Sequence, residues 1–157
     1  MINIVGEYEL DINIQNMFNT YNLIIKNHNL VTEKGLEFIL KCITNQTTER
    51  LGNIIVGYNQ QDPSQSDTYD TFTNPQDLQN DPPVVEENVL IYKATIDGSV
   101  LHNTTEIGIL GTENTLITRD VHDRYDIPYN ALITLQYTLT LSNIENEKIE
   151  EEETLND

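Results

Sequence analysis

Residues 29–59 hold the one stretch of this chain that predicts a helix, and a short apolar strand follows it directly. Thr32 is placed to cap the helix, which we expect over about residues 32–44, and Glu33 suits the positive end of the helix dipole. The apolar residues that recur at the spacing i, i+3, i+4 and i+7 are Leu36, Ile39, Leu40 and Ile43. A helix this short is not stable alone, so this stripe must lie on a sheet or on a neighbouring subunit.

The chain around the helix alternates with the period of two that is typical of half-buried strands. The apolar face of the first strand is formed by Ile2, Ile4, Tyr8, Leu10, Ile12 and Ile14. The last strand, residues 133–141, alternates just as regularly. Asp97-Gly98 is a turn signal, after which Ser99 to His102 are expected to return as an antiparallel strand. We therefore predict a mainly β fold, an antiparallel β-sandwich with one short amphipathic α-helix packed on it.

Three segments are expected along the chain. Residues 1–28 are predicted to be an N-terminal strand arm, and residues 29–143 the β-sandwich domain. Inside the domain, residues 60–83 are rich in polar residues and proline and are expected to form a long loop. Residues 144–157 carry a run of acids and are predicted to be an acidic C-terminal tail.

Charge excludes several kinds of partner. The 157 residues include 26 Asp and Glu against 8 Lys and Arg, a net charge of -18. Nucleic-acid phosphates and anionic membranes are bound by clustered Lys and Arg, so neither is expected as a partner. The acidic tail instead suits a basic surface on a neighbouring protein. With the single cysteine, Cys42, and no signal peptide, assembly in a reducing cytoplasm is expected.

The sequence offers little catalytic chemistry. None of the common hydrolase, zinc-protease or phosphate-loop motifs is present. Cys42 lies beside the apolar stripe and is interpreted as a structural residue. The densest set of possible ligands, residues 120–126, lacks the glycine and closing glutamate of an EF-hand loop. Calcium bound there, or between subunits by Asp62, Asp67 and Asp70, stays an alternative to a solvated loop. No enzyme activity, cofactor or metal is predicted.

The long loop contains the aromatic residues Tyr69 and Phe72, and Tyr58 lies just before the loop begins. If exposed in a concave site, Tyr69 and Phe72 would suit stacking on a sugar. If buried between subunits, they would serve assembly. The simplest alternative is that they pin the loop to the sandwich.

Several motifs, taken in order, resemble the small β-rich modules of tailed-bacteriophage virions, of the tail-fibre, collar and baseplate type. The matching pieces are Leu30-Val31-Thr32, Gly35-Leu36, Ile54-Ile55-Val56-Gly57, the loop 60–83, Glu106-Ile107-Gly108-Ile109, Leu116-Ile117-Thr118-Arg119 and the final strand 133–141. The resemblance covers residues 29–143. The segment before residue 29 and the acidic tail have no counterpart in these modules.

The resemblance implies a non-enzymatic structural protein of the virion, assembled in the host cytoplasm. It implies a homo-oligomer, with a trimer favoured, that attaches to other virion proteins. The candidate contact residues are Ile4, Tyr8, Leu10 and Ile12 of the first strand, Tyr69 and Phe72 of the long loop, and Glu151 and Glu152 of the tail. The alternative function is a carbohydrate-binding β-sandwich for recognition of a host surface, using Tyr69 and Phe72.

Overall fold

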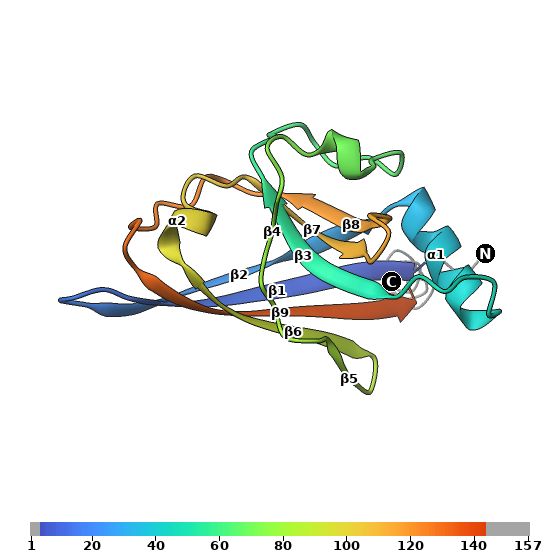
Figure 1. Ribbon diagram of the computed structural model, residues 1–157, viewed down its shortest axis with the longest axis horizontal. Helices are drawn as coiled ribbons and strands as arrows, with labels where there is room; N and C mark the ends of the chain where they lie inside the picture. The colour runs from blue at the N-terminus through green and yellow to red at the C-terminus, as the bar shows by residue number, and fades with distance from the viewer. Residues whose placement is uncertain (1–3, 144–157) are drawn as a thin grey trace, which may run out of the picture.

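The computed structural model describes the backbone of residues 4–143, and the side chains of residues 7–28 and 30–140. Figure 1 shows a long, tapered molecule with the helix α1 at one end and the turn between β1 and β2 at the other. The elements are β1 (Ile4–Gln15), β2 (Thr20–Val31), α1 (Glu33–Ile43), β3 (Leu51–Gly57), η1 (Tyr69–Thr71), β4 (Gln76–Asp77), β5 (Val84–Glu86), β6 (Val89–Asp97), α2 (Gly98–Leu101), β7 (Glu106–Gly111), β8 (Leu116–Val121) and β9 (Leu132–Asn143).

The strands form two packed antiparallel layers, as predicted. Their order through both layers is β4-β3-β7-β8-β2-β1-β9-β6-β5. One layer contains β2, β1, β9, β6 and β5, and the other contains β8, β7, β3 and β4. The pairing passes from one layer to the other at the end of β2, where Leu30 and Val31 pair with Arg119 and Thr118 of β8. A second link follows β4, where Asn80 forms an isolated bridge with Ala94 of β6. The predicted mainly β fold with a packed helix is therefore confirmed.

The core follows from the register of four adjacent strands. Leu10 of β1 lies opposite Ile25 of β2 and Tyr137 of β9, and Tyr137 lies opposite Tyr92 of β6. Because side chains alternate between the faces of a sheet, this register places one apolar row from each strand on the inner face. Tyr8, Leu10, Ile12 and Ile14 on β1 are at most 3% exposed. The alternation predicted for the first and last strands is thus the source of the core.

The first strand does not form a separate arm. β1 lies inside its layer, paired with β2 over Gly6–Gln15 and with β9 over Ile4–Gln15. The predicted arm at residues 1–28 is therefore wrong for the part that the structure describes. The long apolar face of β1 can be buried within one chain, so it has no need of a neighbouring subunit. The acidic tail, residues 144–157, lies outside the described residues.

Both ends of α1 are capped by local hydrogen bonds. The Thr32 hydroxyl accepts a bond of 2.9 Å from the amide of Gly35, which confirms the predicted N-cap. At the other end Asn45 takes a left-handed conformation with φ of 56°. The amides of Asn45 and Gln46 then bond to the carbonyls of Cys42 and Lys41, a Schellman arrangement that ends the helix.

The helix packs through a different face from the predicted stripe. Gly35 and Phe38 are its buried residues, with Ile39 and Cys42 half-buried behind them. Leu36, Leu40 and Ile43 point outward and are 37%, 63% and 73% exposed. The cause is Gly35: a β-carbon there would lie 2.3 Å from the carbonyl oxygen of Ile117, so only glycine lets the helix lie this close to β8. Of the predicted stripe, only Ile39 packs against the chain's own core, and the other three residues are exposed.

Two further segments differ from the prediction. Residues 98–102 do not return as a strand, because Gly98–Leu101 form the short helical turn α2 against the start of β9. The long loop 60–83 is not featureless: it contains η1 and the two-residue strand β4, which pairs with Ile55 and Val56 of β3.

Substituting Gly35 with alanine should destabilise the protein by about 1–3 kcal/mol, because the helix must move away from β8 and alanine's better helix propensity offsets only part of that strain. Urea unfolding measures the change. Lys34→Ala, one residue earlier on the exposed face, is the control and should stay within about 0.5 kcal/mol of the wild type. Equal stability of the Gly35→Ala protein would show that the close approach is not a constraint.

Candidate functional site

The candidate contact residues of β1 lie inside the protein. Tyr8, Leu10 and Ile12 belong to the hydrophobic core, so they cannot be contact residues on the surface of the folded chain. The side chain of Ile4, and Glu151 and Glu152 of the tail, lie outside the described residues. The predicted assembly surface therefore does not include Tyr8, Leu10 or Ile12.

The two loop aromatics pin the loop to the sandwich. Phe72 is 6% exposed and packs in a small apolar cluster with Ile55, Leu110 and Leu116. Tyr69 is half-buried and packs against the same cluster. Phe72 is thus not exposed for stacking on a sugar, and this part of the carbohydrate-binding alternative is wrong.

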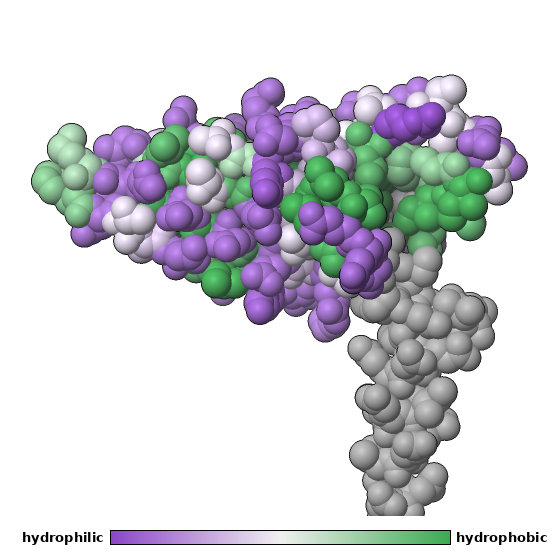
Figure 2. All heavy atoms as spheres, turned by 90° about the horizontal axis from the view of Figure 1, so that it is seen from below, coloured by the Kyte–Doolittle hydropathy of each residue, from purple (hydrophilic) through white to green (hydrophobic). Residues whose placement is uncertain are grey.

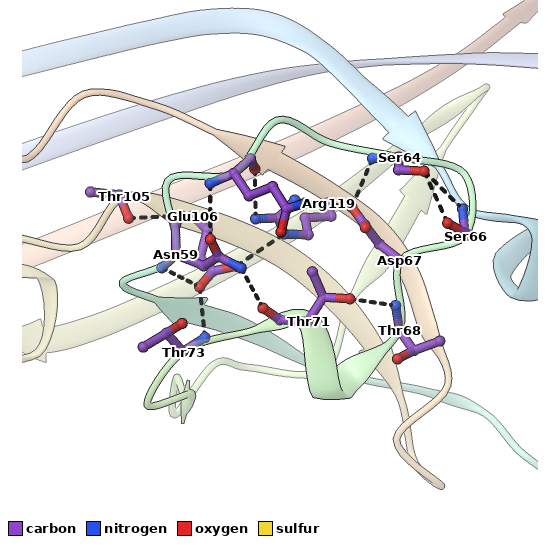
Figure 3. Close-up of polar contacts among 11 residues, drawn as sticks. Asn59, Ser64, Ser66, Asp67, Thr68, Thr71, Thr73, Thr105, Glu106 and Arg119 are labelled. Atoms are coloured by element: carbon purple, nitrogen blue, oxygen red, sulfur yellow. Dashed lines mark hydrogen bonds and ion pairs between the residues drawn. The ribbon is translucent and has the colours of Figure 1, made fainter.

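A buried arginine fixes the loop from below, as Figure 3 shows. Arg119 of β8 is fully buried and donates from Nε to Glu106 of β7 at 3.0 Å and from Nη1 to Asp67 of the loop at 2.9 Å. Its Nη2 donates to the carbonyl of Gln61 at 3.0 Å, and its guanidinium lies 5.7 Å from the centre of the Phe72 ring. A buried charge is tolerated only when it is paired in this way.

Glu106 ties two further points of the loop to the same centre. Its Oε2 accepts hydrogen bonds from the amides of Asn59 and Thr73, at 2.7 and 3.0 Å. The loop also meets the helix, since the amide of Glu33 donates to the carbonyl of Gln65 at 2.8 Å. In the sequence, Glu106 and Arg119 stand out only as parts of two motifs that resemble virion modules. Two opposite charges inside otherwise apolar strands were the signal of a buried ion pair.

A second buried acid lies where β8 and β2 separate. Asp120 is 5% exposed and accepts hydrogen bonds from the hydroxyl of Tyr8 and, at 3.5 Å, from the amide group of Asn27. Burial raises the pKa of Asp120, and these hydrogen bonds oppose the rise. Tyr8 in turn stacks on Tyr137, with ring centres 5.5 Å apart. Asp120 is therefore held in place by Tyr8, which is itself fixed by its stacking on Tyr137 in the core.

The possible metal ligands do not converge. Among residues 4–143 no group of three or more His, Cys, Asp or Glu side chains is close enough to hold a metal ion. Asp120 and Asp67, from the two segments considered for calcium, are engaged with Tyr8 and Arg119 instead. Cys42 is a free, half-buried thiol.

The most distinctive surface is apolar and lies at the helical end of the molecule. We call it the α1–β5 surface: it consists of Leu36, Leu40 and Ile43 of α1 and Val84 and Val85 of β5. Val84 and Val85 are 55% and 66% exposed. Between the two elements lies a groove of about 700 Å³ with an almost entirely apolar lining that includes Phe38, Ile39, Cys42 and Leu139. Figure 2 shows the hydrophobic side chains gathered over these elements.

The charges of α1 are balanced, two acids against two lysines, unlike those of the chain as a whole. Glu37 lies between Lys41 and Lys34, at 2.9 and 3.5 Å. The hydrogen bond from Lys41, and the charges of both lysines, lower the pKa of Glu37. Arg50 adds another cation at the groove. The helix therefore presents an apolar row flanked by paired charges, within a chain of net charge -18.

The comparisons with known proteins give no family. No protein-family model, curated protein or solved structure matches the chain. No helix among the described residues is long and apolar enough to cross a membrane.

Replacing Arg119 with methionine should destabilise the protein by about 3–5 kcal/mol, because Glu106 and Asp67 would keep buried charges without a cation. Urea unfolding measures this loss. The double substitution Arg119→Met with Glu106→Gln should recover part of it. If the double variant is no more stable than the single one, the buried charge of Glu106 is not the source of the loss.

Replacing Asp120 with asparagine should change how stability depends on pH. The pKa of Asp120 is raised in the folded state, so the folded protein binds this proton more tightly than the unfolded chain does. This contribution is fully present below the unfolded pKa of about 4 and is lost as pH rises through the folded pKa. The Asp120→Asn protein should therefore gain stability relative to the wild type as pH rises.

Urea unfolding of both proteins, from above the isoelectric point of about 4.2 to neutral pH, checks this. Asp77→Asn, at an exposed position on β4, controls for the loss of one negative charge. A stability difference that does not vary with pH would mean that Asp120 titrates normally.

Proposed function

We propose that this chain is a structural component of a tailed-phage virion, of the tail, collar, baseplate or fibre-base type, and that it acts by assembly and without catalysis. The observation that carries the assembly is the α1–β5 surface, since an isolated chain would expose this apolar face to water. The resemblance of residues 29–143 to virion modules supports the setting.

The partner at the α1–β5 surface is a second copy of the chain. Copies that each carry a charge of -18 repel one another over most of their surface. At the α1–β5 surface this repulsion is reduced, because Lys34, Lys41 and Arg50 offset most of the nearby acids. A projecting row, Leu40 and Ile43, lies beside a hollow of similar chemistry. Insertion of the row of one copy into the hollow of the next is a head-to-tail contact. Such a contact forms a closed ring, as in the expected trimer, when the rotation between copies closes.

The assembly is tested by measuring the mass of the purified protein in solution at micromolar concentration. We expect three chains of 18.0 kDa in one particle. Leu40→Glu combined with Ile43→Glu should yield folded monomers, since the two new charges would be desolvated in the contact. Phe18→Glu replaces an apolar residue that is even more exposed, 87%, at the opposite end, and should leave the trimer intact.

A homogeneous monomer of the wild type that binds no virion protein would contradict the proposal. Raising the salt concentration should strengthen assembly, because salt screens the repulsion between acidic chains. Mass spectrometry of purified tailed-phage particles from cells that make the protein tests the setting separately. Absence of the chain from such particles would contradict the proposed virion setting but not the proposed oligomer.

A further inference from the structure

The outer edge of β2 has no strand beside it for most of its length. β1 pairs with the inner edge over Asn29 to Thr20, whereas β8 pairs with the outer edge only at Leu30 and Val31. Among the described residues no strand continues this pairing toward Thr20. A long free edge of this kind is a template for an added strand.

The backbone groups of this edge are turned outward. The amide of Thr32 donates to the carbonyl of Ile117 on β8, and every second residue of a strand turns the same way. The amides of His28, Lys26 and Ile24 therefore face the free edge. The amide of His28 bonds to the side chain of Asn27 at 2.9 Å instead of to a strand.

A cleft of about 1030 Å³ lies along the same edge. One wall is β2, with Leu23 and Ile25 half-buried, and the other is the segment 121–127 that follows β8. Leu23 and Ile25 continue the inner apolar rows of β1, so the cleft exposes part of the core face of the sheet. An extended chain in this place would cover that face as it paired with the edge.

Two polar groups in the cleft have no partner within the described protein. Tyr125 is 5% exposed, and its hydroxyl makes no hydrogen bond. Nε2 of His122, whose ring stacks on Tyr125 with centres 3.9 Å apart, is likewise buried and unbonded. Buried polar atoms are nearly always paired, so these two leave hydrogen-bonding capacity unused in the wall of the cleft.

The charged residues that line the cleft favour a basic ligand. Its lining contains Asp62, Asp123 and Asp126 against the single cation Arg124. We propose that the cleft receives an extended basic segment of another protein, which adds as a strand to the free edge of β2. Its alternate side chains cover Leu23 and Ile25, its basic side chains meet Asp123 and Asp126, and its backbone meets Ile24 and Lys26. The site shares no residue with the α1–β5 surface, so it stands whether or not the trimer forms.

The test uses a fluorescein-labelled peptide of alternating valine and lysine, as long as the free edge of β2. We expect the full-length protein to bind it, as measured by fluorescence anisotropy. A peptide of the same composition, with its lysines grouped at one end, should bind far more weakly. In hydrogen exchange followed by NMR, the alternating peptide should protect the amides of Ile24 and Lys26.

Ile24→Pro removes one outward amide without touching the pairing to β1, and should weaken binding by about tenfold, the loss expected for one or two backbone hydrogen bonds. Ile24→Thr keeps that amide and should bind like the wild type. Asp123→Lys with Asp126→Lys, both at exposed positions, should also weaken binding and does not depend on the proline variant folding.

Three results would overturn the proposal. One is equal binding of the two peptides, which would show attraction to charge alone. Another is the absence of binding, or protection that appears away from β2. The third is protection of Ile24 and Lys26 in the protein alone that grows with its concentration, since the occupant would then be a second copy.

Discussion

The central position of β1 is the constraint on which the rest of the fold depends. Its even-numbered residues from Tyr8 to Ile14 are buried, and they are in register with inner rows on β2 and β9. A shift of one residue in the register would turn these four apolar side chains to solvent. It would also bury the polar side chains of the other face in the core. The strand that looked like a separate arm is thus the element around which both of its neighbours are aligned.

Strong periodicity made much of the fold predictable from the sequence. The strands at both ends, the N-cap Thr32 and the helix itself follow from local patterns. The face that α1 buries could not be predicted, because it is set by a close approach of Gly35 to the backbone of β8, 82 residues along the chain at Ile117. Nor could local patterns pair Arg119 with Asp67, since a loop must first fold over the sheet to bring them together.

The failure of the predicted stripe is informative about the candidate site. The amphipathic pattern of Leu36, Leu40 and Ile43 is real, but the chain's own sheet does not use it. The choice of Tyr8, Leu10 and Ile12 was wrong for the opposite reason: these side chains are buried within one chain. Apolar periodicity predicts that a face will be covered, and only the three-dimensional structure reveals whether the chain covers it itself.

The long loop joins the buried ion pair to the helix. Arg119 holds Gln61 and Asp67, and between them the carbonyl of Gln65 receives the first amide of α1. The loop thus supports the N-terminal end of the helix. A change of loop sequence that moved Gln65 would tilt α1, and with it the direction in which Leu40 and Ile43 project. Variation in a segment remote from the α1–β5 surface would in this way change the direction of any contact made through that surface.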